Sequence, residues 1–175
     1  MTLIPAVRAD VTESQRTLSA LNLVKLCVGA DTIEDLAEWQ AHVSATRKAA
    51  GEDPRPRHVT RMWPRREAEI VGTEGARGSL YWVIRGLILV RQPILGFEEV
   101  REEDGIRRCA IMLDPGLMRT ETRPRGPFQG WRYLETKDAP PDLGPWRGAR
   151  AGGPQPLPVH LEAELSAMGV LQPAG

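Results

Sequence analysis

The sequence contains few of the residues that define several common protein classes. Among its 175 residues are only two cysteines and three histidines, and these show no CxxC and no paired spacing, which argues against a zinc site and a disulfide framework. No GxSxG elbow is present, and the glycines at 72, 75 and 78 match neither a P-loop nor a dinucleotide fingerprint. We therefore expect Cys27 and Cys109 to be buried thiols, with no metal and no cofactor.

Long apolar runs and an excess of one charge are also lacking. No run approaches the ~20 apolar residues that span a bilayer, and Met1–Asp10 lacks the features of a secretory signal, so we expect a cytoplasmic protein with no membrane partner. The 23 basic and 23 acidic side chains cancel. However, residues 45–91 carry ten basic and five acidic side chains, and residues 117–137 carry five and two. If these two segments meet in space, they form one positive surface.

Composition along the chain predicts a single folded domain over residues 21–138. Residues 1–20 are polar and aperiodic, which is typical of a flexible N-terminal extension. Residues 139–157 are rich in proline and glycine and are predicted to be a linker. Residues 158–175 are expected to form a short amphipathic helix, with Leu161, Leu165 and Met168 on one face, and a tail.

The domain is predicted to combine one long helix with several strands. Asn22–Gly29 is a short apolar run typical of a buried strand, and Asp31 or Thr32 can cap a helix that ends before Gly51. Asp104-Gly105 favours a tight hairpin turn, and Gly86 is the expected bend within a strand of about fourteen residues. The further strands are expected over His58–Trp63, Ser79–Gln92, Ile94–Arg101, Ile106–Leu113 and Leu117–Arg123, with a short helix over Arg65–Val71. This pattern indicates an α+β fold built on a curled, mainly antiparallel sheet.

Arginines lie close to aromatic residues at several places in the sequence, including Pro124–Tyr133, which we interpret as an irregular loop. Aromatic rings stack on bases and guanidinium groups bridge phosphates, so the pattern predicts a non-catalytic cleft that binds RNA or a nucleotide. The arginines would contact phosphate, the rings would stack, and Gln129 would read a base edge. The same residues also suit a core and a surface without a ligand. The candidate residues are Arg61, Trp63, Arg65, Arg66, Arg85, Arg123, Arg125, Phe128, Gln129, Trp131 and Arg132.

Two alternatives of other classes stay open. The first is an enzyme that acts on a nucleotide-like small molecule, with Glu67, Glu69, Glu121 or His58 as the nearest acid or base. The second is a protein-interaction module that docks through the C-terminal helix or the aromatic loop, because tryptophan and arginine are common anchors.

Four strings in the sequence are long and distinctive: NLVKLCVGADTIEDLAEWQ at 22–40, HVTRMWPRR at 58–66, GSLYWVIRG at 78–86 and RPRGPFQGWRYL at 123–134. Together they resemble an uncharacterised bacterial family, domain of unknown function 1489, over about residues 21–143. The family has no established activity, so this resemblance implies kinship without a function.

The predicted order of elements is also similar to that of another group of proteins. A basic strand and short helix, a glycine loop, a long strand and a hairpin resemble the small β-barrels of the PUA and ASCH group, which bind RNA or modified bases. This second resemblance implies a PUA-like barrel. The ASCH signature GxKxxExR is absent, because Gly75 is followed by Ala-Arg-Gly-Ser-Leu-Tyr-Trp.

Overall fold

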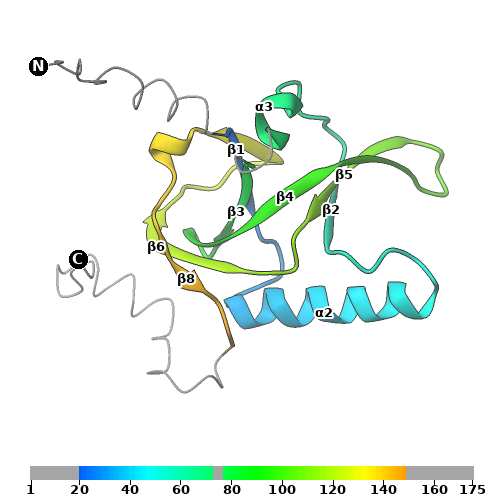
Figure 1. The fold of residues 1–175 in the computed structure, drawn as a ribbon, viewed down its shortest axis with the longest axis horizontal. Coiled ribbons are helices and arrows are strands. Elements are labelled where there is room, and N and C mark those ends of the chain that lie inside the picture. Colours follow the sequence, from blue (N-terminus) through cyan, green and yellow to red (C-terminus); the bar gives the residue numbers. More distant parts are fainter. Residues whose placement is uncertain (1–19, 73–76, 149–175) are drawn as a thin grey trace, which may run out of the picture.

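The computed structural model describes residues 20–72 and 77–148. One long helix lies beside a sheet, and a two-stranded hairpin extends away from the rest of the sheet (Figure 1). The elements are β1 (Asn22–Leu26), α2 (Ile33–Ala49), β2 (Arg57–Thr60), α3 (Glu67–Val71), β3 (Ser79–Ile84), β4 (Leu87–Arg101), β5 (Arg107–Leu113), β6 (Met118–Pro124), β7 (Trp131–Leu134), a 3-10 turn η1 (Thr136–Asp138) and β8 (Asp142–Pro145).

The eight strands form a mixed sheet. Its main path runs β2-β5-β4-β3-β1-β7, and β6 pairs with both β4 and β8. β1 and β3 are parallel, while the other pairings are antiparallel. Within the described ranges, the two end strands β2 and β7 do not pair with each other, so the sheet is neither closed nor strongly curled. The α+β class and the helix near the N-terminus are confirmed, but the curled barrel that we expected is not observed.

The strong β pattern between Ser79 and Gln92 forms two strands rather than one bent strand. Arg85 and Gly86 have φ angles of 49° and 79°, and two successive positive φ angles produce a two-residue hairpin turn between β3 and β4. The first half of β4 pairs with β3 and β6, and its second half pairs with β5. The predicted turn at Asp104-Gly105 does join β4 to β5, and Gly105 has φ 70°.

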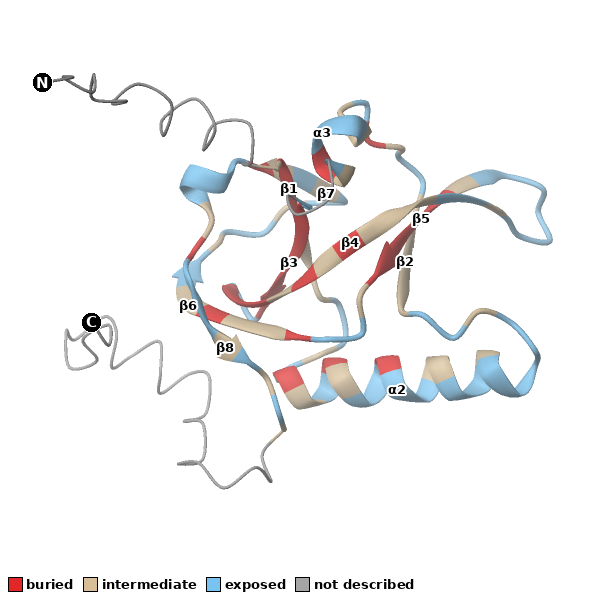
Figure 2. Ribbon diagram, in the orientation of Figure 1, coloured by how far each residue is buried: buried red, intermediate tan, exposed pale blue. Residues whose placement is uncertain are grey.

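Helix α2 begins at the predicted cap. The backbone N–H of Asp35 donates to Thr32 Oγ1 at 3.1 Å, and the N–H of Thr32 donates to Asp35 Oδ2 at 3.0 Å, which completes a capping box. Only the first half of α2 packs against the sheet, through Ile33, Leu36 and Gln40, and the second half is mostly exposed (Figure 2).

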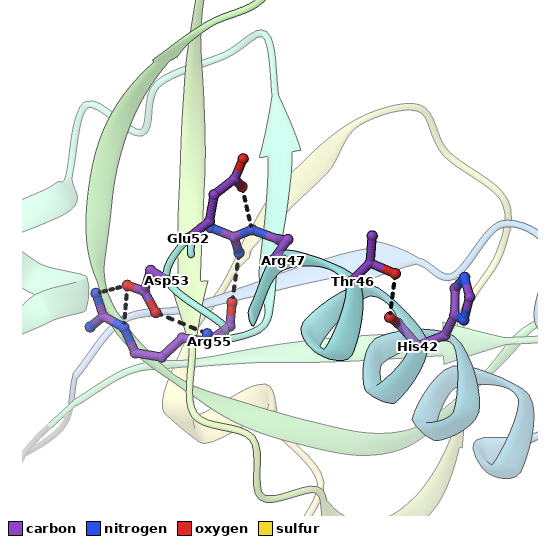
Figure 3. Close-up of polar contacts among 6 residues, drawn as sticks. All are labelled: His42, Thr46, Arg47, Glu52, Asp53 and Arg55. Atoms are coloured by element: carbon purple, nitrogen blue, oxygen red, sulfur yellow. Dashed lines mark hydrogen bonds and ion pairs between the residues drawn. The ribbon is translucent and has the colours of Figure 1, made fainter. Parts of the chain in front are cut away.

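Arg47 holds the segment that leads from α2 to β2. Its Nε donates to Glu52 at 3.4 Å and its guanidinium also donates to the carbonyl of Arg55 at 3.0 Å, while Arg55 pairs with Asp53 (Figure 3). These contacts hold the segment before β2, and the pairing of His58 with Ile111 of β5 then places His58 in that strand.

The sheet buries a hydrophobic cluster on each face. The cluster on the face toward α2 includes Leu23, Leu36 and Trp82, and the cluster on the opposite face includes Val24 and Ile88. Leu23 and Val24 are neighbours in β1, and successive side chains of a strand point to opposite faces. We call these the α2 face and the outer face of the sheet.

Two segments that we expected to be irregular contain strands. Within the presumed aromatic loop, β7 pairs with β1 in register from Asn22↔Leu134 to Lys25↔Trp131. Within the presumed linker, β8 pairs with β6, so strand pairing continues to Pro145. The predicted N-terminal extension up to residue 19 and the predicted C-terminal helix lie outside the described residues.

Candidate functional site

Most of the predicted binding residues divide into two groups on opposite faces of the sheet, and strand β7 shows why. Trp131 packs against the cluster on the α2 face, whereas Arg132 lies in register with Val24 of the outer face. The single cleft that the sequence predicted is therefore split by the sheet. We call the segment Arg61–Arg66 together with Trp131, which a hydrogen bond to the carbonyl of Met62 joins, the Trp131 group; its predicted residues are Arg61, Trp63, Arg65, Arg66 and Trp131. The Phe128 group contains Arg123, Arg125, Phe128, Gln129 and Arg132, and Arg85 lies in the β3–β4 turn.

In the Trp131 group, the tryptophan side chains already form hydrogen bonds and ring contacts within the protein. Trp63 Nε1 donates to Glu67 at 2.6 Å, and the Trp63 ring lies 6.4 Å from that of Phe97. Trp131 Nε1 donates to the carbonyl of Met62 at 3.1 Å, which joins β7 to the segment before α3. Both tryptophans are half-buried and pack against the core, so part of each ring is already covered within the protein.

Of the three arginines in the Trp131 group, Arg66 is paired with carboxylates. Arg66 donates to Glu69 at 2.6 and 2.8 Å and to Glu135 at 3.3 Å, and these hydrogen bonds raise the pKa of its guanidinium. Arg61 acts electrostatically on Asp104. Arg65 is exposed. Glu69 and Glu135 therefore offset the positive charge of Arg66.

The Phe128 group has a different arrangement. The guanidinium carbons of Arg125 and Arg132 each lie 5.5 Å from the centroid of the Phe128 ring, as in cation–π contacts. Arg132 donates to the carbonyls of Gln129 and Trp131 at 2.6 and 3.0 Å, and Arg123 donates to the carbonyl of Asp138. None of these three arginines forms an ion pair with a carboxylate in the described part of the chain.

Arg85 joins neither group through its side chain. Its guanidinium donates to Asp31 at 3.0 Å, and both side chains are largely exposed. Its neighbour Gly86 accepts a backbone hydrogen bond from Arg125 at 2.8 Å, so the β3–β4 turn does lie next to the Phe128 group.

The structure also contains a pocket of about 350 Å³ that the sequence did not predict. It lies between the first turns of α2 and the carboxyl end of β1, and we call it the α2 pocket. Most of its wall is apolar, and the polar side chains are Lys25, Cys27, Asp35 and His58. The remaining lining residues are Leu26, Val28, Gly29, Ala30, Leu36, Trp39 and Trp82.

Strand periodicity explains why Lys25 and Cys27 line this pocket. In β1, Leu23 and Lys25 alternate with Val24, so they lie on the α2 face, and Cys27, directly after the strand, packs against the cluster on that face. The register places Lys25 between Trp82 of β3 and Trp131 of β7. Lys25 is half-buried, and it pairs with no carboxylate among residues 20–72 and 77–148.

Burial controls the ionisation of the other polar groups in the α2 pocket. It lowers the pKa of His58 to about 4, with a further contribution from the charge of Lys25, so the imidazole is neutral at pH 7. The His58 ring also meets the Trp82 ring edge to face at 5.7 Å. Burial raises the pKa of the Cys27 thiol to about 11, and that of the Cys109 thiol to about 12. Both cysteines therefore remain protonated thiols, as we expected, although Cys27 is only partly buried.

Of the four residues named for the enzyme alternative, only His58 lines the α2 pocket. Glu67 bonds Trp63, Glu69 pairs with Arg66, and Glu121 lies on β6. Sequence reasoning missed Lys25, although a single charged residue within the apolar string NLVKLCVG was a usable signal. No group of three or more metal-binding side chains gathers in the described part of the structure.

These observations define an α+β protein with an unclosed mixed sheet, one long helix and an apolar pocket beneath the start of that helix. The chain belongs to the DUF1489 family of proteins of unknown function, which it matches over residues 23–171. It has no match among the curated proteins and none among the solved structures, so no structural neighbour supports the resemblance to PUA and ASCH barrels. No helix of the described ranges is long and apolar enough to cross a membrane.

Proposed function

We propose that this protein binds single-stranded RNA, without catalysing a reaction, through the Phe128 group on the outer face of the sheet. The observation that carries the proposal is the presence of Arg123, Arg125 and Arg132 on that side with no carboxylate partner in the described residues. By contrast, Arg66 of the Trp131 group is paired with two glutamates. Arg61 and Arg65 form no ion pair in the described residues either, but only the first set gathers two guanidinium groups without a carboxylate partner on one aromatic ring.

Phe128 has a positioning role in this proposal. Arg125 and Arg132 both lie against its ring, and the ring is half-buried on the outer-face cluster. Holding two guanidinium groups in place reduces the conformational entropy that they lose when a ligand binds. Their remaining N–H groups can donate to phosphate oxygens, and their flat faces can stack on unpaired bases.

The register of the sheet extends this surface. Arg123 lies opposite Ile88, and Arg132 lies opposite Val24. Ile88 and Val24 belong to the outer-face cluster against which Phe128 packs. The exposed Gln129 lies beside Arg132, where its amide can reach a base edge. We leave Trp63 and Trp131 out of this surface, because their rings pack on the α2 face.

The experiment is a titration of the full chain with a fluorescein-labelled oligouridylate of twelve nucleotides at several salt concentrations. Loss of phosphate contacts lowers both the affinity and its salt dependence, by a slope of about 0.7 per contact for a single strand. We expect Arg125→Ala with Arg132→Ala to weaken binding at least about tenfold and to reduce the salt slope by about 1.4. The matched control is Arg55→Ala with Arg101→Ala, which removes the same charge from two exposed, ion-paired arginines.

The proposal fails if wild-type protein shows no saturable binding at low salt, or if the control pair weakens binding as much as the Arg125 and Arg132 pair. A competition with uridine monophosphate separates a strand from a nucleotide: we expect millimolar mononucleotide to displace little of the labelled strand, because a mononucleotide offers only one phosphate.

A further inference from the structure

We infer that the α2 pocket binds a small aromatic carboxylate, with the Lys25 ammonium holding the carboxylate and Trp39 covering the aromatic ring above the buried Trp82. This site lies on the α2 face, on the opposite side of the sheet from the Phe128 group. The inference does not depend on RNA binding.

The shape and lining of the pocket suit a compact apolar ligand. Its volume of about 350 Å³ lies at the lower end of the range of small-molecule sites, roughly 300–1,000 Å³. Leu36 and Trp82 are buried within the wall, and Trp82 is fixed by a hydrogen bond from Nε1 to Gln92 at 2.8 Å. The buried indole of Trp82 therefore forms part of a rigid apolar floor, and the exposed indole of Trp39 offers the surface for a flat ring.

Exposed apolar side chains border the same pocket. Val28 is 89% exposed and Trp39 is 55% exposed, and both line the α2 pocket. They are two of five large apolar side chains that are exposed in the described residues. Exposed apolar groups that meet at one concave place indicate a surface that a ligand covers.

The charges in the pocket favour an anion. Lys25 is its single cationic residue, and its half-buried ammonium has no carboxylate partner in the described part of the chain. The pocket also holds one acidic residue, Asp35, but its Oδ2 accepts the backbone N–H groups of Asp31 and Thr32 at 3.0 Å. That carboxylate keeps its charge, but it lies at the N-terminus of α2, where the helix dipole offsets part of it. The ammonium of Lys25 is therefore the one group of the pocket that can pair with an anion.

The two remaining polar groups are neutral at pH 7 and can only supplement this charge. His58 carries an imidazole with one donor and one acceptor nitrogen. Neither ring nitrogen forms a hydrogen bond with the described residues. Cys27 keeps its proton and is a weak donor. A carboxylate can accept from the ammonium and from the imidazole N–H together, whereas a cationic ligand would be repelled by Lys25.

The test is isothermal titration calorimetry of the full chain with 2-naphthoate and with its uncharged isostere 2-naphthamide. The two probes share one ring system and differ in charge. We expect naphthoate to bind at least about tenfold more tightly than naphthamide, since a charge-assisted contact is roughly twice as strong as a neutral one.

Three variants assign the contacts. Lys25→Met should remove the preference for naphthoate, and Trp39→Ala, at an exposed position, should weaken both probes by a similar factor. Lys48→Met is the matched control, because Lys48 lies in the exposed last turn of α2, outside the pocket. It should change neither affinity.

Equal binding of the two probes to wild-type protein, or no binding of naphthoate, would overturn the inference. This comparison uses the wild-type protein alone, so it does not depend on whether a variant folds. A loss with Lys48→Met equal to that with Lys25→Met would overturn it as well. The Arg125→Ala and Arg132→Ala protein should bind naphthoate as the wild type does, so failure of the RNA proposal and failure of this one give different results.

Discussion

The side-chain amides of Gln40 and Gln92 hydrogen-bond each other twice, because each Nε2 donates to the other's Oε1 at 2.9 Å. Both side chains are buried. Gln92 also accepts from Trp82 Nε1 and donates to the carbonyl of Asp114 at 2.9 Å. This network joins α2 to β4 and holds Trp82 in the wall of the α2 pocket.

Replacing Gln40 by leucine should destabilise the protein by about 1–3 kcal/mol, because Gln92 then loses two hydrogen bonds and one N–H of its amide is left without a partner in a buried place. Urea unfolding followed by circular dichroism measures the change. The same substitution at the exposed Gln129 is the control and should stay within about 0.5 kcal/mol. Equal effects at the two positions would show that the paired amides contribute nothing specific.

Arg85 is the only non-glycine residue with positive φ in the described parts of the chain. Its ion pair with Asp31 is exposed and contributes little. Asparagine tolerates this backbone conformation and suits the first position of such a turn. Arg85→Asn should therefore raise the free energy of unfolding by about 0.5–1 kcal/mol. A decrease would mean that the Asp31 contact outweighs the backbone preference.

Gly78 lies where three segments of backbone meet. A Cβ added there would lie 2.0 Å from the carbonyl oxygen of Leu21 and 3.1 Å from that of Ile70. Gly78→Ala should cost about 3 kcal/mol or more, since backbone rather than a flexible side chain must move. Gly96→Ala, which meets no atom within 4 Å, is the control in thermal unfolding. A Gly78→Ala protein as stable as this control would contradict the close approach.

The stability should depend on the ionisation of His58. The unfolded chain binds a proton near pH 6.5, but the folded chain does so only near pH 4. The stability that neutral His58 contributes is therefore complete above about pH 6.5 and is lost as the pH falls from 6.5 to 4. A shift of the pKa from 6.5 to about 4 corresponds to a loss of at most about 3 kcal/mol.

Comparing wild-type protein with His58→Gln in urea at pH 7 and pH 4.5 isolates this effect, because the carboxylates titrate in both proteins. The wild type should lose more stability than the variant between the two pH values. Parallel losses would show that His58 does not stay neutral in the folded state.

The sequence correctly predicted the features that a few neighbouring residues determine, such as a helix cap and a tight turn. Thr32 and Asp35 are three residues apart and form the expected cap, and Asp104-Gly105 forms the expected turn. The break at Arg85-Gly86 was missed because arginine is a weak indicator of positive φ and the flanking residues continue the same β pattern.

The candidate sites were harder to predict, because they depend on which face of the sheet each residue occupies. The presumed loop around Trp131 contains the strand β7, whose alternation places Trp131 and Arg132 on opposite faces. Lys25 and His58 meet in one pocket although 33 positions separate them in the numbering, and only the packing of α2 against the sheet creates that space.

The proposed RNA surface is tested most directly by following the Nε–Hε signals of the arginines by NMR while unlabelled oligouridylate is added. We predict saturable shifts of the Arg123, Arg125 and Arg132 signals, with the Arg55, Arg66 and Arg101 signals unchanged because carboxylates hold those side chains. Shifts confined to the carboxylate-paired arginines, or no saturable shift at low salt, would contradict the proposal.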